Sequence, residues 1–443
     1  MWRAEPDRNA AFFVALSAAL VAGTCSRESH LEPIRPARPA FAASALPVAA
    51  NAPSLGITSA APPALPPLLE AGALPSGGLL PRFQAALGAL DAKTRRDHVR
   101  VLWLGDSHTA ADYMTGAFRR RLAERFGVGG PGLVRLGVGA YRHSGVKLVR
   151  EGRWRVEPTP PSSRSTEGDT ALGFEGMRSI PADARARVEA HIDSRFVSDP
   201  VHYELLFDLP ASASFRVTLG KQSTLVNAKS AFERVNGSPL LRLRFEAPAS
   251  AGLEIDRITG APRFYGMIAE GTAPGVVVDT SGIDGARFGT ALAWNPDVLA
   301  GELAARRPDL IVLAYGTNEA FDNRRVDAYA TEVTELVTRL RRGAPDADCL
   351  ILGPPDAGAP DYSSLPRVAE IEAVLSRTAV KLGAAFYSLR ESMGGTGSFV
   401  RWLKETPPLA RGDRIHFTPL GYERLGETLA DSLIAAYSKK PVK

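Results

Sequence analysis

The stretch "VLWLGDSHTA" at residues 101–110 is a run of large apolar residues that stops abruptly at Gly-Asp-Ser. The apolar run predicts a buried strand, and the turn after it has two interpretations. In the first, it is an ordinary strand-to-helix connection: Gly105 provides backbone freedom and Asp106 or Ser107 caps the next helix. In the second, Ser107 is a nucleophile at the carboxyl edge of an α/β sheet, where open sheets bind ligands. The tripeptide alone does not decide between them.

The sequence around this stretch predicts an α/β domain with a parallel sheet. Apolar residues recur at four-residue steps from Met114 to Phe126, which is typical of an amphipathic helix, and Gly127 is a natural end for it. The three arginines at 119–121 lie on this helix, where we expect a solvated face. From residue 275 onward, apolar strands alternate with helices to the end of the chain, which predicts a sheet covered on both faces.

Residues 141–274 have a different pattern. Short alternating segments such as "HYELLFDL" and "SFRVTLG" are separated by turn signals such as "NGS" and "APASAG", which favours a β-sandwich or jelly roll. This block therefore interrupts a single α/β domain, whose two parts we place at 81–140 and 275–443.

The amino terminus predicts export. Residues 1–25 contain "AFFVALSAALVAG", an apolar run too short to span a bilayer, followed by "TC", which resembles a lipoprotein signal with Cys25 as the lipidated residue. Residues 26–80 are rich in Pro and Ala and predict a linker. We therefore expect a protein of the periplasm or cell envelope that Cys25 can anchor to a membrane. The other cysteine, Cys349, opens an apolar strand and is expected to be buried.

Composition excludes several other classes. Hydrophobic residues make up 45% and charged residues 23% of the 443 residues, which is ordinary for a globular protein. The net charge of +5 is too small, and the basic residues too dispersed, to indicate a nucleic-acid partner. The two cysteines lack the spacing of a metal site or a redox pair.

Three more turns carry residues suited to acyl-transfer chemistry. "SGIDGA" at 281–286 follows a strand, and its glycine N–H groups can approach a substrate closely. The turn "YGTNE" places Asn318 after another strand, where it either caps a helix or donates to an oxyanion. "GDRIHFTPLG" precedes the last helix and holds Asp413 and His416 three residues apart. Taken alone, this pair fits an ordinary surface loop as well as an acid that orients a catalytic base.

The order Ser, Gly, Asn and then Asp-x-x-His resembles the four sequence blocks of the SGNH (GDSL-type) hydrolases. The resemblance covers residues 97–140 and 264–443 and implies a flavodoxin-like, three-layer α/β fold. It also implies roles for the residues of the four blocks. The nucleophile, base and orienting acid would be Ser107, His416 and Asp413, and the oxyanion donors would be Ser107, Gly285 and Asn318.

Two positions depart from the simplest match. Glu319 stands where the family usually has Asp, and Gly282 competes with Gly285 for the second block. His108 adjoins the nucleophile, but adjacent side chains rarely face each other, so we expect it to line the cleft or pack. The resemblance implies no metal and no organic cofactor.

The inserted β-rich block makes the chain similar to the branch with peptidoglycan O-acetylesterases and O-acetyltransferases, in which the insertion resembles a carbohydrate-binding module. The leading hypothesis is an esterase that removes acetyl groups from envelope glycan. The alternatives are acetyl transfer to a sugar hydroxyl and a catalytically silent glycan-binding lipoprotein. We expect the insertion to form a wall of the cleft, with both junctions near the Ser107 and Gly285 turns. Most of its scattered aromatic residues should pack in a core; these are Trp154, Phe174, Tyr203 and Phe264.

Overall fold

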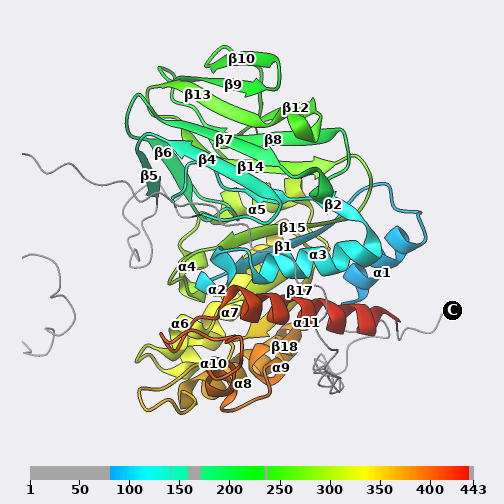
Figure 1. Cartoon of the computed structure of the whole chain (residues 1–443), viewed down its shortest axis with the longest axis vertical. Coiled ribbons are helices and arrows are strands. Elements are labelled where there is room, and N and C mark those ends of the chain that lie inside the picture. The colour runs from blue at the N-terminus through cyan, green and yellow to red at the C-terminus, as the bar shows by residue number, and fades with distance from the viewer. Residues whose placement is uncertain (1–79, 140, 158–170, 235–237, 439–443) are drawn as a thin grey trace, which may run out of the picture. The chain divides into compact units, whose positions relative to one another are not determined.

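The computed structural model describes residues 80–139, 141–157, 171–234 and 238–438. The expected signal peptide, Cys25 and the linker up to residue 79 lie outside them. The α/β domain is built on a six-stranded parallel sheet (Figure 1). Its strands, in spatial order, are β18 (Ala385–Ser388), β17 (Asp348–Gly353), β16 (Leu310–Ala314), β1 (Val99–Gly105), β15 (Val276–Gly282) and β2 (Val128–Gly130).

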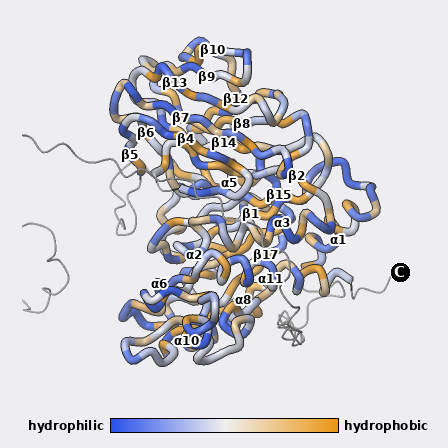
Figure 2. The backbone as a smooth tube through the Cα atoms, in the orientation of Figure 1, coloured by the Kyte–Doolittle hydropathy of each residue, from blue (hydrophilic) through white to orange (hydrophobic). Residues whose placement is uncertain are grey.

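Helices cover both faces of this sheet, because its strands are apolar on both sides. One face packs on α1 (Pro81–Asp91), α3 (Met114–Phe126) and α11 (Pro419–Ser438). The other packs on α5 (Pro296–Arg306), α7 (Val326–Gly343) and α8 (Pro366–Leu382). In Figure 2 the central strands are mostly hydrophobic along their length. Short helices occupy the connections: α2 (Ser107–Ala110), α4 (Phe288–Leu292), α6 (Thr317–Ala320), α9 (Leu389–Ser392) and α10 (Ser398–Leu403). The predicted three-layer fold is confirmed.

Two antiparallel sheets form the predicted β-sandwich. The first contains β10 (Gln222–Asn227), β9 (Ser214–Leu219), β13 (Leu253–Thr259), β7 (Arg187–Ile192) and β4 (Val146–Glu151). The second contains β11 (Glu233–Arg234), β12 (Leu241–Ala247), β8 (Val201–Asp208), β14 (Arg263–Gly271), β6 (Arg178–Pro181) and β5 (Trp154–Glu157), and β3 (Gly132–Val134) pairs with β14. Two single 3₁₀ turns, Ser194–Phe196 and Ala249–Ala251, complete the elements.

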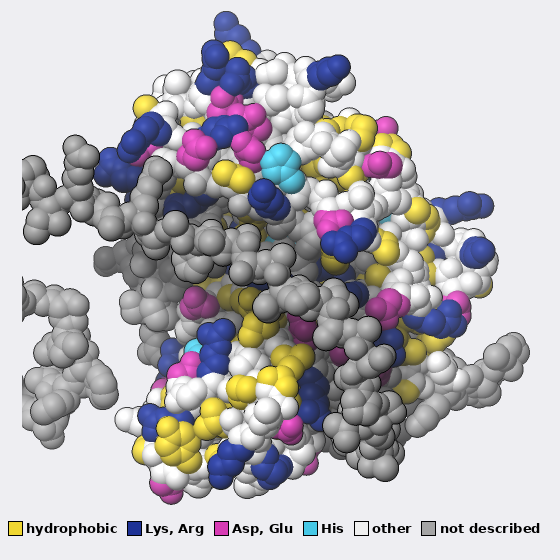
Figure 3. All heavy atoms as spheres, viewed as in Figure 1, with side chains coloured by type: hydrophobic (Ala, Val, Ile, Leu, Met, Phe, Trp, Pro, Cys, Tyr) yellow, Lys and Arg dark blue, Asp and Glu magenta, His cyan; other side chains and the backbone are white. Residues whose placement is uncertain are grey.

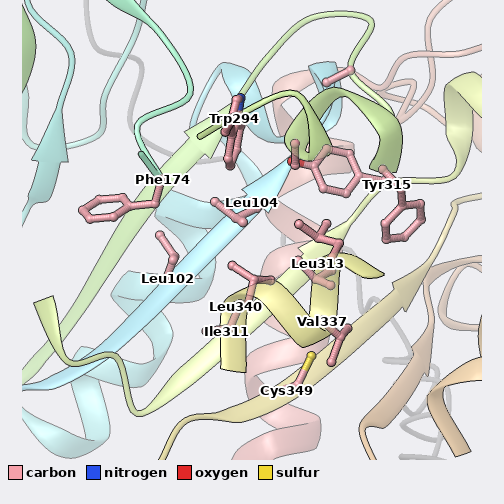
Figure 4. Close-up of a cluster of buried hydrophobic side chains, with 14 of the residues drawn as sticks. Leu102, Leu104, Phe174, Trp294, Ile311, Leu313, Tyr315, Val337, Leu340 and Cys349 are labelled. Atoms are coloured by element: carbon pink, nitrogen blue, oxygen red, sulfur yellow. The ribbon is translucent and has the colours of Figure 1, made fainter. Parts of the chain in front are cut away.

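The second sheet packs against other elements on both of its faces. One face, with Tyr203 and Phe264, packs against the first sheet in the sandwich core. The opposite face contributes Leu206 and Ile268 to the same core as α5 and α7 of the α/β domain. Figure 4 shows that core, in which Phe174 and Trp294 lie near the strand residues Leu102 and Leu104. The insertion is therefore part of the α/β domain's packing.

The aromatic residues of the insertion mostly serve this packing, as expected. Phe174, Tyr203 and Phe264 are buried, and Trp154 is half-buried with its indole N–H donating to the Glu151 carbonyl at 2.9 Å.

Buried charges join the insertion to the α/β domain at the amino edge of the parallel sheet. Glu270 on β14 pairs with Arg100 of β1 at 2.8 Å and with Arg306 of α5 at 2.7 Å. Arg306 also pairs with Asp279 of β15 at 2.6 Å. Neighbouring arginines lower the pKa of Glu270 despite its burial, so this carboxylate stays charged in the interface.

The expectation of a fully solvated arginine face at 119–121 was wrong for Arg119. Its side chain is buried and its guanidinium pairs with the buried carboxylate of Asp112 at 2.6 Å. Arg120 and Arg121 do lie at the surface, where they pair with Glu427 and Asp431 of α11. No helix in the described ranges combines the length and the apolar character that crossing a membrane requires.

Candidate active site

Three predicted turns meet at the carboxyl edge of the parallel sheet. The register aligns Gly105, the last residue of β1, with Gly282 of β15 on one side and with Ala314 of β16 on the other. The three strands therefore end side by side. The turns that follow them carry Ser107, Gly285 and Asn318.

The turn after β1 depends on the residues Gly105 and Asp106. A Cβ at Gly105 would lie 2.1 Å from the Thr109 hydroxyl and 3.0 Å from the Ala314 carbonyl, so only glycine fits there. The Asp106 carboxylate then accepts the His108 N–H at 3.0 Å and caps α2. The turn therefore caps a helix, as the first interpretation predicts, and it places Ser107 at the start of that helix. The role of Ser107 as a nucleophile stays a prediction.

Ser107, His416 and Asp413 form a hydrogen-bonded chain. The Ser107 Oγ lies 3.0 Å from His416 Nε2, and His416 Nδ1 lies 3.0 Å from Asp413 Oδ2. The other carboxylate oxygen of Asp413 accepts the N–H groups of Ile415 and His416 at 3.0 and 2.8 Å. Asp413 therefore fixes both the loop and the ring. With Nδ1–H donated to Asp413, Nε2 is left as an acceptor for the serine proton.

Hydrogen bonds favour the ionised form of Asp413. Burial acts to raise the pKa of Asp413, but its hydrogen bonds from the backbone and from His416 outweigh it and lower that pKa. These hydrogen-bonded side chains are open to solvent, since those of Asp413 and His416 are 45% and 33% exposed. A bulky substrate can therefore reach it.

The residues predicted for the oxyanion lie in the turns beside Ser107. Gly285 has φ of +73°, a conformation that favours glycine. The Asn318 amide donates one N–H to the Ala286 carbonyl at 3.0 Å, which ties its turn to the Gly285 turn and leaves its second N–H available. Among the described residues, no acceptor is bonded to the backbone N–H of Ser107 or of Gly285. Gly282 is the last residue of β15 and lies within the sheet.

Glu319 connects the turn that carries Asn318 to the segment that follows the Gly285 turn. Its carboxylate accepts the Gly316 N–H at 3.0 Å and the Phe288 N–H at 2.9 Å, so it joins the asparagine turn to the start of α4. Burial raises the pKa of Glu319 to about 8. The sequence showed this residue only as a departure from a family pattern, because its partners are backbone groups that a sequence does not reveal.

His108 packs, as expected. Its ring is buried, its Nδ1 lies 3.0 Å from the Tyr422 hydroxyl, and it lies 5.5 Å from the His416 ring centroid to centroid. Burial lowers the pKa of His108 to about 3, so the ring is neutral. The ring of His108 therefore packs against the ring of His416.

The two junctions between the insertion and the α/β domain lie at different ends of the parallel sheet. The entry at 141–145 lies beside α2, because the Asp112 carboxylate accepts the Ser144 N–H at 2.7 Å. The return at Val276 pairs with Val99 at the amino edge, so the expected proximity of that junction to Gly285 was wrong. The full length of β15, roughly 23 Å for seven residues, separates them.

Comparisons with known proteins concern the family and the fold, and the range that the family model matches does not include Ser107. The model of the GDSL-like Lipase/Acylhydrolase family matches residues 251–424, a range that begins near the end of the insertion and includes Gly285, Asn318, Asp413 and His416. A solved structure of a peptidoglycan O-acetylesterase is 26% identical, with a TM-score of 0.67 over 81% of this chain and 97% of that one. The chain is an SGNH hydrolase. It is related to the branch that contains that esterase.

Two other solved structures are less similar to this hydrolase. A lipase/acylhydrolase from Enterococcus faecalis is 19% identical, with a TM-score of 0.29 over 36% of this chain and 77% of its own. The acetyl xylan esterase AlAXEase is 17% identical, with a TM-score of 0.28 over 37% of this chain and 81% of its own. The comparison with curated proteins gave no match.

Proposed function

We propose that this SGNH hydrolase is a serine esterase that removes O-acetyl groups from an envelope polysaccharide, with peptidoglycan as the first candidate. The observation that carries the proposal is the chain Ser107–His416–Asp413 with both hydrogen bonds at 3.0 Å. The proposed class of substrate is supported by the likeness to a peptidoglycan O-acetylesterase, which extends over nearly the whole length of that protein.

In the first half-reaction Ser107 Oγ attacks the acetyl carbonyl while His416 Nε2 takes the hydroxyl proton. The new Oγ–C bond gives a tetrahedral intermediate, whose oxyanion accepts hydrogen bonds from Ser107 N–H, Gly285 N–H and the free amide N–H of Asn318. The C–O bond to the sugar then breaks, and His416 returns the proton to the sugar oxygen. The acetyl group remains on Ser107.

In the second half-reaction water attacks the acetyl-enzyme. His416 takes a proton from the water, the intermediate forms in the same oxyanion site, and the Oγ–C bond breaks as Ser107 regains its proton. Acetate leaves. Asp413 stabilises the imidazolium of His416 in both halves and does not itself take up the proton.

The openness of the site supports a polymeric substrate. Asp413 and His416 are partly exposed, and the first turn of α11 presents Leu420 to solvent as well. A chain of sugars can lie across such a surface while one acetyl group enters the site.

An envelope substrate implies export, which is the role we propose for residues 1–25, with Cys25 as a membrane anchor and residues 26–80 as a tether. We propose no nucleic-acid partner. Metabolic labelling with a fatty acid tests the anchor, and a Cys25→Ala variant that still carries the label refutes it.

The test of the function is a hydrolysis screen on p-nitrophenyl acetate, acetylated xylan and O-acetylated peptidoglycan, with acetate measured directly. The proposal predicts acetate release from the glycan. Formation of a newly acetylated sugar without acetate would instead identify a transferase. Absence of turnover on every ester, with correct folding, would contradict the proposal.

A further inference from the structure

A single arginine at the entry to the insertion is held rigidly beside the active site. The Arg142 guanidinium lies over the Tyr113 ring, with its Cζ 4.0 Å from the ring centroid. Its NH1 group donates to the carbonyls of Ala111 and Asp112 at 3.1 and 3.2 Å and to the Ser144 hydroxyl at 3.3 Å. Stacking and three acceptors on one nitrogen fix the plane of the guanidinium.

The rest of that guanidinium is available for a ligand. Arg142 is exposed, and among the described residues nothing accepts a hydrogen bond from its Nε or NH2 group. The nearby Asp112 carboxylate does not neutralise it, because that carboxylate is buried and occupied by Arg119, Thr115 and the Ser144 N–H. Arg142 bonds to the carbonyl of Asp112 instead.

Arg142 belongs to the minority of arginines in the described ranges that form no ion pair with Asp or Glu. Most arginines of the described ranges form ion pairs with Asp or Glu, and Figure 3 shows basic and acidic side chains interspersed over the face in view. At the active-site edge, by contrast, Arg142 has no carboxylate partner among the described residues, and neither do Arg411 and Arg414, which flank Asp413. Acidic groups lie at this edge as well, namely Asp413 and the exposed Asp284, but neither forms an ion pair with Arg142.

Arg142 is connected to the catalytic residues by direct contacts. Tyr113 beneath it stacks on Tyr422 at 6.4 Å, and the Tyr422 hydroxyl lies 3.0 Å from His108, which packs on His416. On the other side, the Ala111 carbonyl that it binds ends α2, the four-residue helix that begins at Ser107. That helix is about 6 Å long, so a substrate bound at Ser107 can extend to Arg142.

We infer that Arg142 forms a carboxylate-binding subsite, in which its free guanidinium edge recognises an acidic group of the acetylated glycan near the ester that Ser107 attacks. The planar fork of Nε and NH2 matches the two oxygens of a carboxylate. The insertion would then select the substrate through its first residues, since Arg142 belongs to its entry. The inference rests on the proposed esterase function and names the feature of the glycan that the enzyme reads.

The test compares Arg142→Gln with Arg142→Lys and with a matched control, Arg377→Gln. Arg377 is also exposed and without an ion pair among the described residues, but it lies in the second half of α8, away from the catalytic edge. Each protein is assayed for kcat/KM on p-nitrophenyl acetate, on O-acetylated peptidoglycan fragments, and on the same fragments after amidation of their carboxylates.

For Arg142→Gln, we expect the ratio of kcat/KM on the acidic fragments to kcat/KM on p-nitrophenyl acetate to fall about tenfold. The fall should be smaller for Arg142→Lys, and amidation of the fragments should abolish the difference between wild type and Arg142→Gln. Arg377→Gln should match the wild type on all three substrates.

Two results would overturn the subsite. One is a fall for Arg142→Gln no greater than that for Arg377→Gln, and the other is an equal fall on acidic and amidated fragments. In both cases the wild type would still hydrolyse esters, so the esterase proposal would stand. A wild type that is inactive on every ester would overturn the esterase proposal and the subsite with it.

Discussion

Replacing Asp413 with asparagine tests the hydrogen-bonded chain at its exposed end. The amide oxygen of the new side chain can still accept the N–H groups of Ile415 and His416, so we expect the loop to keep its shape. The amide nitrogen, however, would face His416 Nδ1 and donate to it. The ring would then carry its proton on Nε2, where it cannot accept the proton of Ser107.

The structure allows the size of this effect to be estimated. Opposite charges about 4 Å apart attract by about 4 kcal/mol at the effective dielectric of a protein surface. Because the Asp413 side chain is 45% exposed, we take roughly half of this, ~2 kcal/mol, as lost stabilisation of the His416 imidazolium. The wrong tautomer adds a loss of similar size. Together they predict a fall in kcat of about 10³.

The assay is steady-state hydrolysis of p-nitrophenyl acetate at neutral pH, with circular dichroism to verify folding. Asp327→Asn is the control, because Asp327 is an exposed aspartate that pairs with its neighbour Arg325 at the protein surface. The control should keep wild-type kcat, and KM should change little in either variant. If Asp413→Asn is folded and retains more than a tenth of wild-type kcat, the role of Asp413 as the orienting acid is refuted.

Three further predictions concern other parts of the molecule. Asn318→Ala should lower kcat about 10²–10³ with little change in KM in initial-rate kinetics, because its amide serves the oxyanion and not the ground state; a pure KM effect would place it in substrate binding. His108→Ala should lower kcat less than tenfold, since this buried ring only supports His416, and a loss as large as that of His416→Ala would contradict this. Burial and the neighbouring Glu175 raise the pKa of Glu302 in the folded protein. The contribution of Glu302 to stability is therefore fully present below its pKa in the unfolded chain, about 4.3, and is lost as pH rises through its pKa in the folded protein. Melting temperatures should therefore fall less on the alkaline side for Glu302→Gln than for wild type, whereas parallel profiles would refute a buried neutral carboxyl.

The sequence predicted the parts of the fold that depend on local pattern. Apolar strands followed by turn residues located β1, β15 and β16, and the four-residue spacing located α3 with its end at Gly127. The same turns marked Ser107 and Asn318, because parallel strands bring their carboxyl ends to one edge.

Long-range pairing was not predictable in this way. Arg119 has the sequence context of a surface arginine, yet it is buried because Asp112 lies beside it with a left-handed φ of +50°. The sheet that contains β8 and β14 packs on both faces, and one of these faces meets α5. The alternation of residues within a strand does not reveal which element will pack against each face. The position of Arg142 depends on the ring of Tyr113 and the carbonyl of Ala111, which are contacts that the sequence does not reveal.

The packing of the insertion on the α/β core also affects how the insertion can be studied. Removing residues 141–274 would expose the α/β core where Leu206 and Ile268 now pack and would leave Arg306 without Glu270. Point substitutions at the surface, such as Arg142→Gln, are therefore the better means of assigning its role.

In the proposed mechanism Ser107 carries the acetyl group during turnover. Wild-type protein mixed with O-acetylated peptidoglycan and quenched rapidly with acid should show, by intact-protein and peptide mass spectrometry, a fraction with one added acetyl group on the peptide that contains Ser107. Ser107→Ala should show none and should release no acetate above background. Acetate release at the wild-type rate by the folded Ser107→Ala variant would contradict a covalent role for Ser107.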